Sequence, residues 1–353
     1  MDDGLQQRIA DWDGMGVLCR RDEASGSWIF IALHDATLGR PTGGTRLKSY
    51  PAPSDALRDA MRLAEGMTHK WAALDFDCGG GKGVIAVPEA IDAAGRERAL
   101  RVYGELIQAL GGGFATGRDL GTTDADMLLL SGITEHVHGV DRQRGTVRDP
   151  GPFTAAGVFA ALESTVERLD GRPGLAGRRV LVQGLGAVGL PLARRLAAAQ
   201  VELLVSDVDA TRADAVAAEL SAASVAAAAV YDTPCDVYAP CAVGATLNAE
   251  TIPRLACSAV VGSANNQLRE GADAERLHRR RVLYAPDFIA NGGGALAFGL
   301  IHRGAHDERD LFRRVDSIRD SLGEVLDEAR RHDESPLAAA RRRVQRALAR
   351  GVS

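Results

Sequence analysis

The chain has 353 residues, of which 46% are hydrophobic and 25% charged, and its net charge is −5 at neutral pH. This length predicts about two domains, and this balance is typical of globular proteins with substantial cores rather than of disordered chains. The negative net charge argues against nucleic acid or an anionic membrane as a partner, because both favour a clustered basic face, and it leaves small molecules as the expected ligands.

Nothing in the chain predicts export, membrane insertion or metal binding. The first four residues are acidic and polar, unlike a secretory signal, and there is no apolar run of about 18 residues. The five cysteines are an odd number without CxxC spacing, so neither a disulfide framework nor a zinc site is expected. His136 and His138 alternate along a predicted strand with no third ligand nearby. We therefore expect a cytoplasmic protein that binds no metal.

The first 150 residues alternate short strands and helices. Residues 16–20 and 28–33 are rich in apolar and β-branched side chains with polar flanks, which predicts a β-hairpin. A helix follows, with cap chemistry at Ser54 and Asp55 and apolar residues at spacings of three and four as far as Trp71. We expect its apolar stripe to pack on a sheet.

Four glycines then surround Lys82 in the segment 79–83, ahead of a strand-like stretch at 84–88. Glycine lets another group approach the backbone closely, so this segment is predicted to be a loop at a binding site. Two helices and a strand complete the first α/β unit, at residues 96–110, 113–117 and 123–130.

From residue 154 a regular alternation of strands and helices predicts a doubly wound parallel sheet, and the chain after Asn291 is predicted to be helical. The glycines and prolines of residues 145–152 predict a hinge between two domains, with a cleft between them. The strands of the second domain are expected at 179–183, 202–205, 236–239, 259–262 and 282–285.

The clearest motif follows the first of these strands and opens a helix: Gly184-Leu185-Gly186-Ala187-Val188-Gly189. In dinucleotide-binding folds such glycines allow a tight turn, close approach of the pyrophosphate to the helix N-terminus and close helix–strand packing. Asp207 stands 23 positions after Gly184, where an acidic side chain binds the ribose hydroxyls and repels a 2′-phosphate. NAD is therefore the expected cofactor.

Two lysines occupy positions where a lysine is unusual, one beside an apolar helix stripe and one among glycines. Lys70 follows Met67 by three residues, which places it along the edge of the helix's apolar stripe, although alone it could simply extend its ammonium group into water. Lys82 has almost no neighbouring side chains to shelter it. Together, these two ammonium groups predict an anion site with acid–base chemistry.

Seven short motifs follow one another along the chain. They are Gly43-Gly44-Thr45-Arg46, Gly66-Met67-Thr68-His69-Lys70, Gly79-Gly80-Gly81-Lys82, Thr116-Gly117-Arg118-Asp119, Gly184 to Gly189, Ala239-Pro240-Cys241-Ala242 and Ser263-Ala264-Asn265-Asn266. In these motifs the chain resembles the leucine, phenylalanine and valine dehydrogenase branch of the amino-acid dehydrogenase superfamily, over nearly its whole length. Residues 183–189 and 284–293 are most similar to actinobacterial phenylalanine and valine dehydrogenases.

The resemblance implies a division of labour between two α/β domains. Residues 1–148 would form a substrate-binding and oligomerisation domain, completed by a C-terminal helix at 332–353, and residues 149–331 a Rossmann-type NAD domain. A homo-oligomer is expected.

The resemblance also implies the catalytic roles. Lys70 would bind the substrate carboxylate, with Asn265 and the backbone of Gly43-Gly44 nearby. Lys82 would polarise the water that attacks the imine and take up a proton from it, while Asp119 exchanges protons with the amino group. Desolvation and the like charge of Lys70 would favour the neutral form of Lys82 and Asp119 would oppose it, so the pair should titrate jointly.

For the cofactor, the resemblance implies that Thr154 and Asn291 flank the nicotinamide amide. The full expected NAD-binding set is Thr154, Gly184, Leu185, Gly186, Ala187, Val188, Gly189, Asp207, Ala242, Ala264, Asn265 and Asn291.

The positions expected to line the pocket for the substrate side chain are mostly small or apolar. None is a lysine that would bind a second carboxylate, so glutamate is a poor candidate. Leucine-specific relatives carry bulkier residues at Gly117 and Ala295, so an aromatic, phenylalanine-like substrate is predicted. Arg118 is expected to lower the pKa of Asp119. The pocket positions are Thr42, Gly44, Met67, Gly117, Ala295 and Phe298.

Several alternatives remain open. The substrate could be leucine or valine, or tryptophan or tyrosine in specialised metabolism. A 2-hydroxy-acid dehydrogenase would share the NAD fold, but it would use a histidine–carboxylate pair in place of the glycine-embedded Lys82. A catalytically silent NAD-binding sensor would bind the cofactor without turning over any amino acid.

Overall fold

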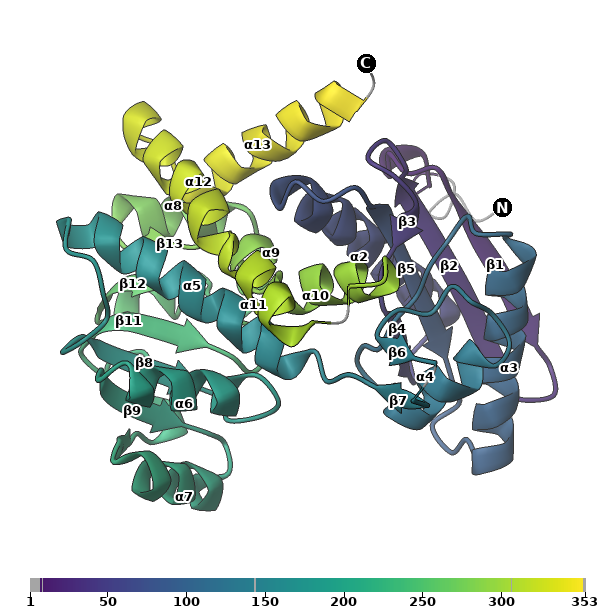
Figure 1. The fold of residues 1–353 in the computed structure, drawn as a ribbon, viewed down its shortest axis with the longest axis horizontal. Coiled ribbons are helices and arrows are strands. Elements are labelled where there is room, and N and C mark those ends of the chain that lie inside the picture. The colour runs from purple at the N-terminus through teal and green to yellow at the C-terminus, as the bar shows by residue number, and fades with distance from the viewer. Residues whose placement is uncertain (1–6, 8, 143, 306, 352–353) are drawn as a thin grey trace. The chain divides into compact units, whose positions relative to one another are not determined.

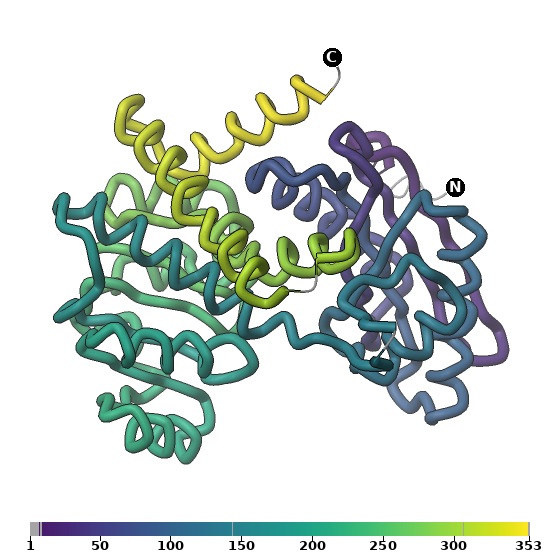
Figure 2. The backbone as a smooth tube through the Cα atoms, viewed as in Figure 1, coloured from purple at the N-terminus to yellow at the C-terminus, as the bar shows by residue number. Residues whose placement is uncertain are grey.

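The computed structural model describes residues 7, 9–142, 144–305 and 307–351. The chain divides into two compact units, and it first passes from one to the other at residues 149–150 (Figures 1 and 2). Unit 1 comprises residues 1–149, 301–303 and 346–353, and unit 2 comprises residues 150–300 and 304–345. Of the expected C-terminal segment 332–353, only the last eight residues are therefore grouped with unit 1. No helix in the described part of the chain is long and apolar enough to span a membrane.

The sheet of unit 1 is mixed. Its strands are β1 (Gly16–Asp22), β2 (Ser27–Asp35), β3 (Pro41–Thr42), β4 (Thr45–Lys48) and β5 (Gly79–Ala86). β1 and β2 form the predicted antiparallel hairpin. β5 lies at the centre, antiparallel to β2 and parallel to β3 and β4. The prediction that residues 79–83 form a loop is wrong, because they are the first part of this central strand.

The glycines of β5 are explained by packing against the protein itself. An added Cβ would lie 1.9 Å from the hydroxyl oxygen of Thr68 at Gly80, and 1.9 Å from the hydroxyl oxygen of Tyr103 at Gly83. Both distances are far below van der Waals contact. Glycine therefore occurs in this strand, despite its poor strand propensity, because other parts of unit 1 approach the backbone closely.

Helices cover both faces of this sheet. α2 (Pro53–Ala73) packs on one face in a cluster that includes Ala60, Ala64 and Val84. α3 (Ala93–Ala109) and α4 (Asp124–Ser131) share with Ile85 the core cluster of the other face. The side chains of neighbouring strand residues therefore point to different helical layers.

Four local predictions in unit 1 need correction. The N-cap residue of α2 is Ala52, whose side chain makes no cap, so the predicted cap residues Ser54 and Asp55 lie inside the helix. The helix begins at Pro53, which has no N–H group that would need a partner. α3 begins before residue 96, because the side chain of Asp92 caps it. Residues 113–117 form only isolated bridges, and the expected hinge contains β7 (Thr146–Val147), which pairs with β6 (Val140–Asp141).

Unit 2 contains the predicted doubly wound parallel sheet. Its order is β10-β9-β8-β11-β12-β13, so the chain reverses its direction of progress between β8 and β11, which is where such sheets bind dinucleotides. The strands are β8 (Arg179–Gln183), β9 (Glu202–Ser206), β10 (Ala223–Ser224), β11 (Cys235–Pro240), β12 (Cys257–Val260) and β13 (Leu283–Tyr284).

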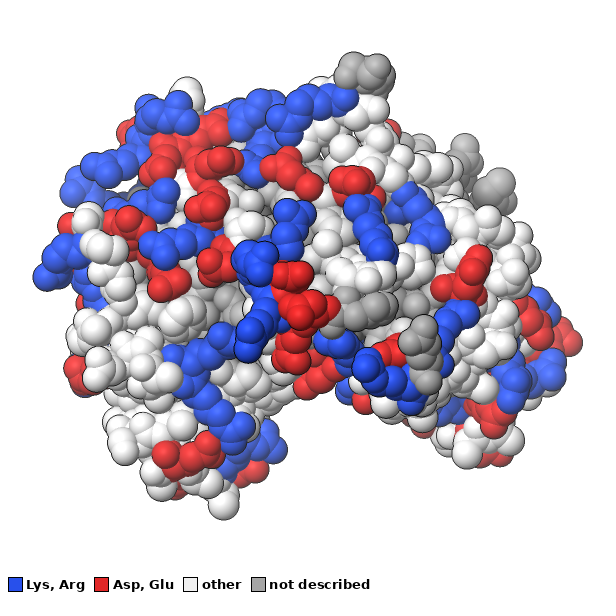
Figure 3. Space-filling model, viewed as in Figure 1, with Lys and Arg blue, Asp and Glu red and all other residues white. Residues whose placement is uncertain are grey.

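The remaining helices follow the predicted pattern, and the chain after Asn291 is mainly helical. They are α5 (Gly151–Asp170), α6 (Gly189–Ala198), α7 (Ala210–Leu220), α8 (Ala272–Arg279), α9 (Asp287–Ala290), α10 (Gly293–His302), α11 (Glu308–Asp316), α12 (Ile318–His332) and α13 (Pro336–Gly351), with short 3₁₀ turns at 227–229 and 252–254. Acidic and basic side chains are interspersed on the surface shown in Figure 3. Arg342 and Arg343 of α13, for example, pair with Glu328 and Glu324.

Candidate active site

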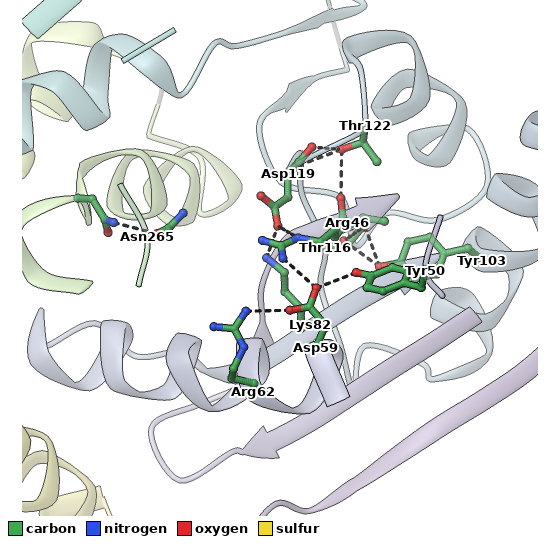
Figure 4. A network of polar contacts seen from close by, with 12 residues as sticks. Arg46, Tyr50, Asp59, Arg62, Lys82, Tyr103, Thr116, Asp119, Thr122 and Asn265 are labelled. Carbon is green, nitrogen blue, oxygen red and sulfur yellow. Dashed lines mark hydrogen bonds and ion pairs between the residues drawn. The ribbon is translucent and has the colours of Figure 1, made fainter. Parts of the chain in front are cut away.

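Unit 1 brings together Lys82 and Asp119, the two residues predicted to be catalytic. Lys82 is only 6% exposed, and its Nζ lies 2.5 Å from Oδ2 of Asp119 (Figure 4). Thr122 fixes the backbone of Asp119: its hydroxyl oxygen accepts a hydrogen bond from the Asp119 N–H at 2.9 Å and lies 2.8 Å from the Asp119 carbonyl oxygen. The pair is therefore a buried lysine in direct contact with a positioned carboxylate.

Two cations hold Asp119 in its charged form. Burial by itself would raise the pKa of this carboxyl, but the charges of Lys82 and Arg46 outweigh burial and lower the pKa to about 2. Arg118 does not make this contact, contrary to expectation, because its guanidinium donates to Asp124 at 2.7 Å. Asp119 therefore carries a negative charge at any pH near neutrality.

Arg46 connects this pair to a second carboxylate. Its Nε lies 3.8 Å from Asp119, and its Nη1 donates to Asp59 at 2.8 Å. Asp59 also accepts hydrogen bonds from the hydroxyl of Tyr50 at 2.7 Å and from Arg62 at 2.8 Å (Figure 4). No role was predicted from the sequence for Arg46 or Asp59. The available signal was the position of Arg46 directly after the glycines of the 43–46 motif.

The glycines predicted to bind substrate lie against these groups. A Cβ on Gly44 would be 2.8 Å from the Cβ of Asp119 and 3.4 Å from Nζ of Lys82. A Cβ on Gly43 would be 1.8 Å from a backbone oxygen of β5 and 3.2 Å from Cγ of Met67. Lys70 is half-exposed in the last turn of α2, one turn beyond Met67, so the two side chains share a side of the helix.

The glycine motif of unit 2 has the geometry that a dinucleotide needs. Gly184 has a φ of +91°, and a Cβ there would lie 2.8 Å from Ala242 at the end of β11. A Cβ on Gly189 would lie 1.8 Å from the Gly184 carbonyl oxygen, whereas a Cβ on Gly186 would meet nothing within 4 Å. The first and third glycines are thus required by packing, while the second borders open space where a pyrophosphate fits. No side chain caps the N-terminus of α6, as expected for a helix end that binds phosphate.

Asp207 secures this motif and keeps capacity for a ribose. Its carboxylate accepts hydrogen bonds from the backbone N–H groups of Leu185 at 2.8 Å and Asp209 at 3.0 Å. Arg212 lies 3.6 Å away. Burial opposes the charge, but the backbone hydrogen bonds and Arg212 together lower the pKa of Asp207. A carboxylate has about four acceptor positions, so adenosine ribose hydroxyls could still bind.

The other predicted residues of unit 2 lie in the segments that follow its strands or on nearby helices. The amide nitrogen of Asn291 donates to the side-chain oxygen of Asn265 at 2.8 Å, which joins two predicted residues. Thr154 is on α5, and a Cβ on Gly294 would be 2.6 Å from its hydroxyl. The residues not yet placed are Ala187 and Val188 in the glycine motif, Ala264 after β12, and Ala295 and Phe298 on α10.

Comparison with known proteins decides the family. Residues 200–304 match the family model described as glutamate/leucine/phenylalanine/valine dehydrogenase, and residues 21–136 match its dimerisation domain. The chain also matches leucine dehydrogenase of Bacillus cereus at 37% identity, over 97% of this chain and 92% of the relative. The chain belongs to the glutamate/leucine/phenylalanine/valine dehydrogenase family. It is an NAD-dependent amino-acid dehydrogenase, and the predicted family, enzyme class and cofactor are confirmed.

Other members of the family agree with this result. Phenylalanine dehydrogenase of Lysinibacillus sphaericus is 38% identical over 97% of this chain and 90% of the relative. The crystal structure of L-tryptophan dehydrogenase from Nostoc punctiforme superposes with a TM-score of 0.84 at 34% identity, covering 98% of this chain and 99% of that one. The predicted two-domain α/β fold is therefore confirmed. Among the described residues, no group of three or more His, Cys, Asp or Glu side chains is arranged to hold a metal ion.

Proposed function

We propose that this dehydrogenase oxidises a hydrophobic L-amino acid, with an aromatic side chain favoured, to the 2-keto acid and ammonia in a reversible reaction. The observation that carries the proposal is the contact between buried Lys82 and ionised Asp119 beside the bare backbone of Gly44. Such a pair can accept, hold and return protons next to a small bound substrate. The similarity to leucine, phenylalanine and tryptophan dehydrogenases supports a hydrophobic amino acid as substrate.

The proposed chemistry needs two proton carriers. The amino acid, NAD⁺ and water give the 2-keto acid, an ammonium ion, NADH and a proton, and bound NAD supplies the hydride acceptor. Asp119 takes a proton from the substrate's amino group, so that the Cα–N bond can become an imine. The ammonium group of Lys82 first loses to solvent the proton that the overall reaction releases, and the neutral amine then removes a proton from the water that attacks the imine carbon. Asp119 returns its proton to the amino group of the resulting carbinolamine, which breaks its C–N bond, and the departing ammonia takes the hydroxyl proton and leaves as ammonium. The 2.5 Å contact between the two groups lets them share these protons.

Binding of the substrate is assigned to neighbouring residues. Lys70 is proposed to hold the carboxylate, together with the backbone of Gly43-Gly44 and the side chain of Asn265. The aromatic preference is supported by Gly117, whose backbone carbonyl accepts a hydrogen bond from the N–H of Thr45, directly after Gly44. The absence of a side chain at Gly117 leaves more room for a ring than an alanine would.

The dinucleotide is proposed to bind at the glycine motif of unit 2. Gly186 and the N-terminus of α6 would hold the pyrophosphate, and Asp207 the adenosine ribose. Thr154 and Asn291 would bind the nicotinamide amide. We also propose a homo-oligomer assembled through the first domain, which the match of residues 21–136 to a dimerisation domain supports.

The central test is turnover of the twenty amino acids with NAD, followed as NADH absorbance, in the wild type and in Lys82→Ala. Loss of one proton-transfer group costs about 10²- to 10⁴-fold in rate, so we expect kcat to fall by about that factor while the fold is retained. Arg20→Ala is the control, because it also replaces a cation by alanine and Arg20 is exposed on β1. An active Lys82→Ala enzyme would reassign the base, and NAD binding without turnover of any amino acid would favour the sensor.

A further inference from the structure

Two cysteines of unit 2 lie side by side on neighbouring strands. Cys235 is the first residue of β11 and Cys257 is the first residue of β12, and the two are direct partners in the parallel register of these strands. Val237 pairs with Ala259 two positions further on. Because direct partners on neighbouring strands point their side chains to the same face of the sheet, the two thiol groups lie next to each other. No cysteine motif predicted this pair, since only strand pairing joins the two positions.

The spacing of the pair suits a disulfide bond. Neighbouring strands lie about 4.8 Å apart, and the Cα atoms of a disulfide are usually about 4.4 to 6.8 Å apart. Both thiols are free, and the side chains of Cys235 and Cys257 are hydrogen-bonded to each other. Rotation of the side chains can therefore bring the two sulfur atoms together without rearranging the sheet.

The surroundings make the two thiols chemically unequal. The hydrogen bond with Cys235 lowers the pKa of Cys257, and the charge of Arg280 acts in the same direction, while burial opposes both. The same hydrogen bond and burial raise the pKa of Cys235. Burial raises the pKa of each of the other three cysteines. A thiolate, and not a thiol, is the attacking form, so Cys257 is the best nucleophile among the five cysteines, all of which lie in the described part of the chain.

The pair is accessible to a small reagent and remote from the predicted cofactor site. Both cysteines are partly exposed at the border of a hydrophobic cluster that contains Tyr238. The predicted NAD-binding residues follow the other ends of the strands, with Ala242 after β11 and Ala264 after β12. At about 3.3 Å per residue, Cys235 lies roughly 20 Å along the chain from Ala242. Oxidation of the pair is therefore expected to leave NAD binding intact.

We propose that Cys235 and Cys257 form a thiol–disulfide exchange site, which reacts with small disulfides of the glutathione type and reversibly cross-links β11 to β12. The thiolate of Cys257 attacks one sulfur of the small disulfide, the S–S bond breaks, and one half leaves as a thiolate that takes up a proton. Cys235 then gives up its proton and attacks the sulfur of Cys257, and the second half leaves and takes up a proton. Two protein thiols are oxidised to one disulfide, and the small disulfide is reduced to two thiols.

The cross-link is expected to stabilise the enzyme under oxidising conditions. It ties together two positions that are distant in the sequence, so it restricts the unfolded chain more than the folded sheet, in which these positions are already neighbours. The oxidised enzyme should therefore melt at a temperature higher by about 5 °C or more. Its kcat should stay within about twofold of that of the reduced enzyme, because the pair lies away from the predicted cofactor site.

The test exposes the full chain to an excess of oxidised glutathione, with Cys19→Ser as the parent because Cys19 is exposed and could itself carry glutathione. Free thiols are counted with a chromogenic thiol reagent, and peptides are mapped by mass spectrometry. We expect the loss of two thiols, a peptide pair joined through Cys235 and Cys257, and recovery of both thiols with excess reduced glutathione. Thermal melting and turnover are measured on the same oxidised and reduced samples.

Two variants in this parent separate the roles of the thiols. Cys235→Ser should stop at the first step and keep glutathione on Cys257, because the second attacking thiol is missing. Cys257→Ser should react with glutathione at Cys235 at least about tenfold more slowly, because the thiolate form of Cys235 is disfavoured. Neither variant should show the rise in melting temperature on oxidation.

Three results would overturn the proposal. They are no cross-link in the parent at saturating oxidised glutathione, a cross-link that involves another cysteine, and faster reaction of Cys235 than of Cys257. A cross-link without a rise in melting temperature would overturn its stabilising effect. The peptide map of the parent decides the matter if a serine variant misfolds. The measurement needs no turnover, so an enzyme that oxidises no amino acid would contradict the proposed function and leave the exchange site standing.

Discussion

Gly44→Ala tests whether the geometry of the Lys82–Asp119 pair controls catalysis. Gly44 does not have a positive φ, so alanine is compatible with its backbone. The added Cβ would lie 2.8 Å from the Cβ of Asp119, whereas ordinary contacts begin at 3.4 Å, so the two atoms must separate by about 0.6 Å. The backbone hydrogen bonds of Asp119 to Thr122 limit how far the loop can retreat.

The expected fall in kcat depends on how far the carboxylate of Asp119 is displaced from its position for proton transfer. A displacement of about 1 Å costs on the order of 100-fold in rate, so a shift of about 0.6 Å is expected to lower kcat between tenfold and 100-fold. Steady-state turnover with the best amino acid and saturating NAD measures this change. Thermal melting of the same sample shows whether the fold is retained.

Gly16→Ala provides the matched control. It places a methyl group at the start of β1, where an added Cβ meets nothing within 4 Å, so kcat should equal that of the wild type. Wild-type kcat in Gly44→Ala, or an equal loss of activity in Gly16→Ala, would show that the geometry of the Lys82–Asp119 pair does not control catalysis.

Two further predictions concern charge. Asp207→Ser should raise the NADP-to-NAD ratio of kcat/KM at least tenfold, because it removes the negative charge that repels a 2′-phosphate. Arg212, which lies 3.6 Å from Asp207, would then attract that phosphate. An unchanged ratio would contradict the assignment of Asp207 to the adenosine ribose. Asp22→Asn should lower the free energy of unfolding at pH 7 by about 1 kcal/mol, because Asp22 is bonded to half-exposed Arg98. Hydrogen bonds from Arg98 lower the pKa of Asp22 to about 2. The difference in free energy of unfolding between wild type and variant should therefore be complete above the usual carboxyl pKa and should shrink as the pH falls through about 2. Denaturant unfolding at several pH values measures this difference.

The rarity of lysine in this sequence is a further signal that points to the active site. Only three of the 42 lysine and arginine residues are lysine: Lys48, Lys70 and Lys82. Arginine remains charged at any pH that a protein experiences, whereas lysine can give up its proton. Since nearly all basic residues of this chain are arginine, its few lysines are candidates for proton transfer. Two of the three were predicted to belong to the active site.

The sequence alone determined the elements whose signals are local. The hairpin of β1 and β2, the strand–glycine–helix motif ending at Gly189, and five of the six strands of the unit 2 sheet were predicted because turn residues and hydrophobic periodicity act over a few neighbours. The two-residue edge strand β10 was not predicted, because it is too short to carry a periodic signal. The approximate extent of α2 was predicted in the same way, but its cap was not, because Ser54 and Asp55 remain good cap residues even where the helix starts earlier.

Only the tertiary structure decided what depends on distant residues. The glycines of 79–83 resemble a loop in the sequence, but pairing with β2, β3 and β4 makes them part of a central strand. The close approach of Thr68 and Tyr103 requires glycine at positions 80 and 83 of that strand. The contact of Lys82 with Asp119 and the stacking of His138 on His302 likewise join segments far apart in the chain. Packing and strand pairing set these contacts, and neither can be calculated from the composition of a local window.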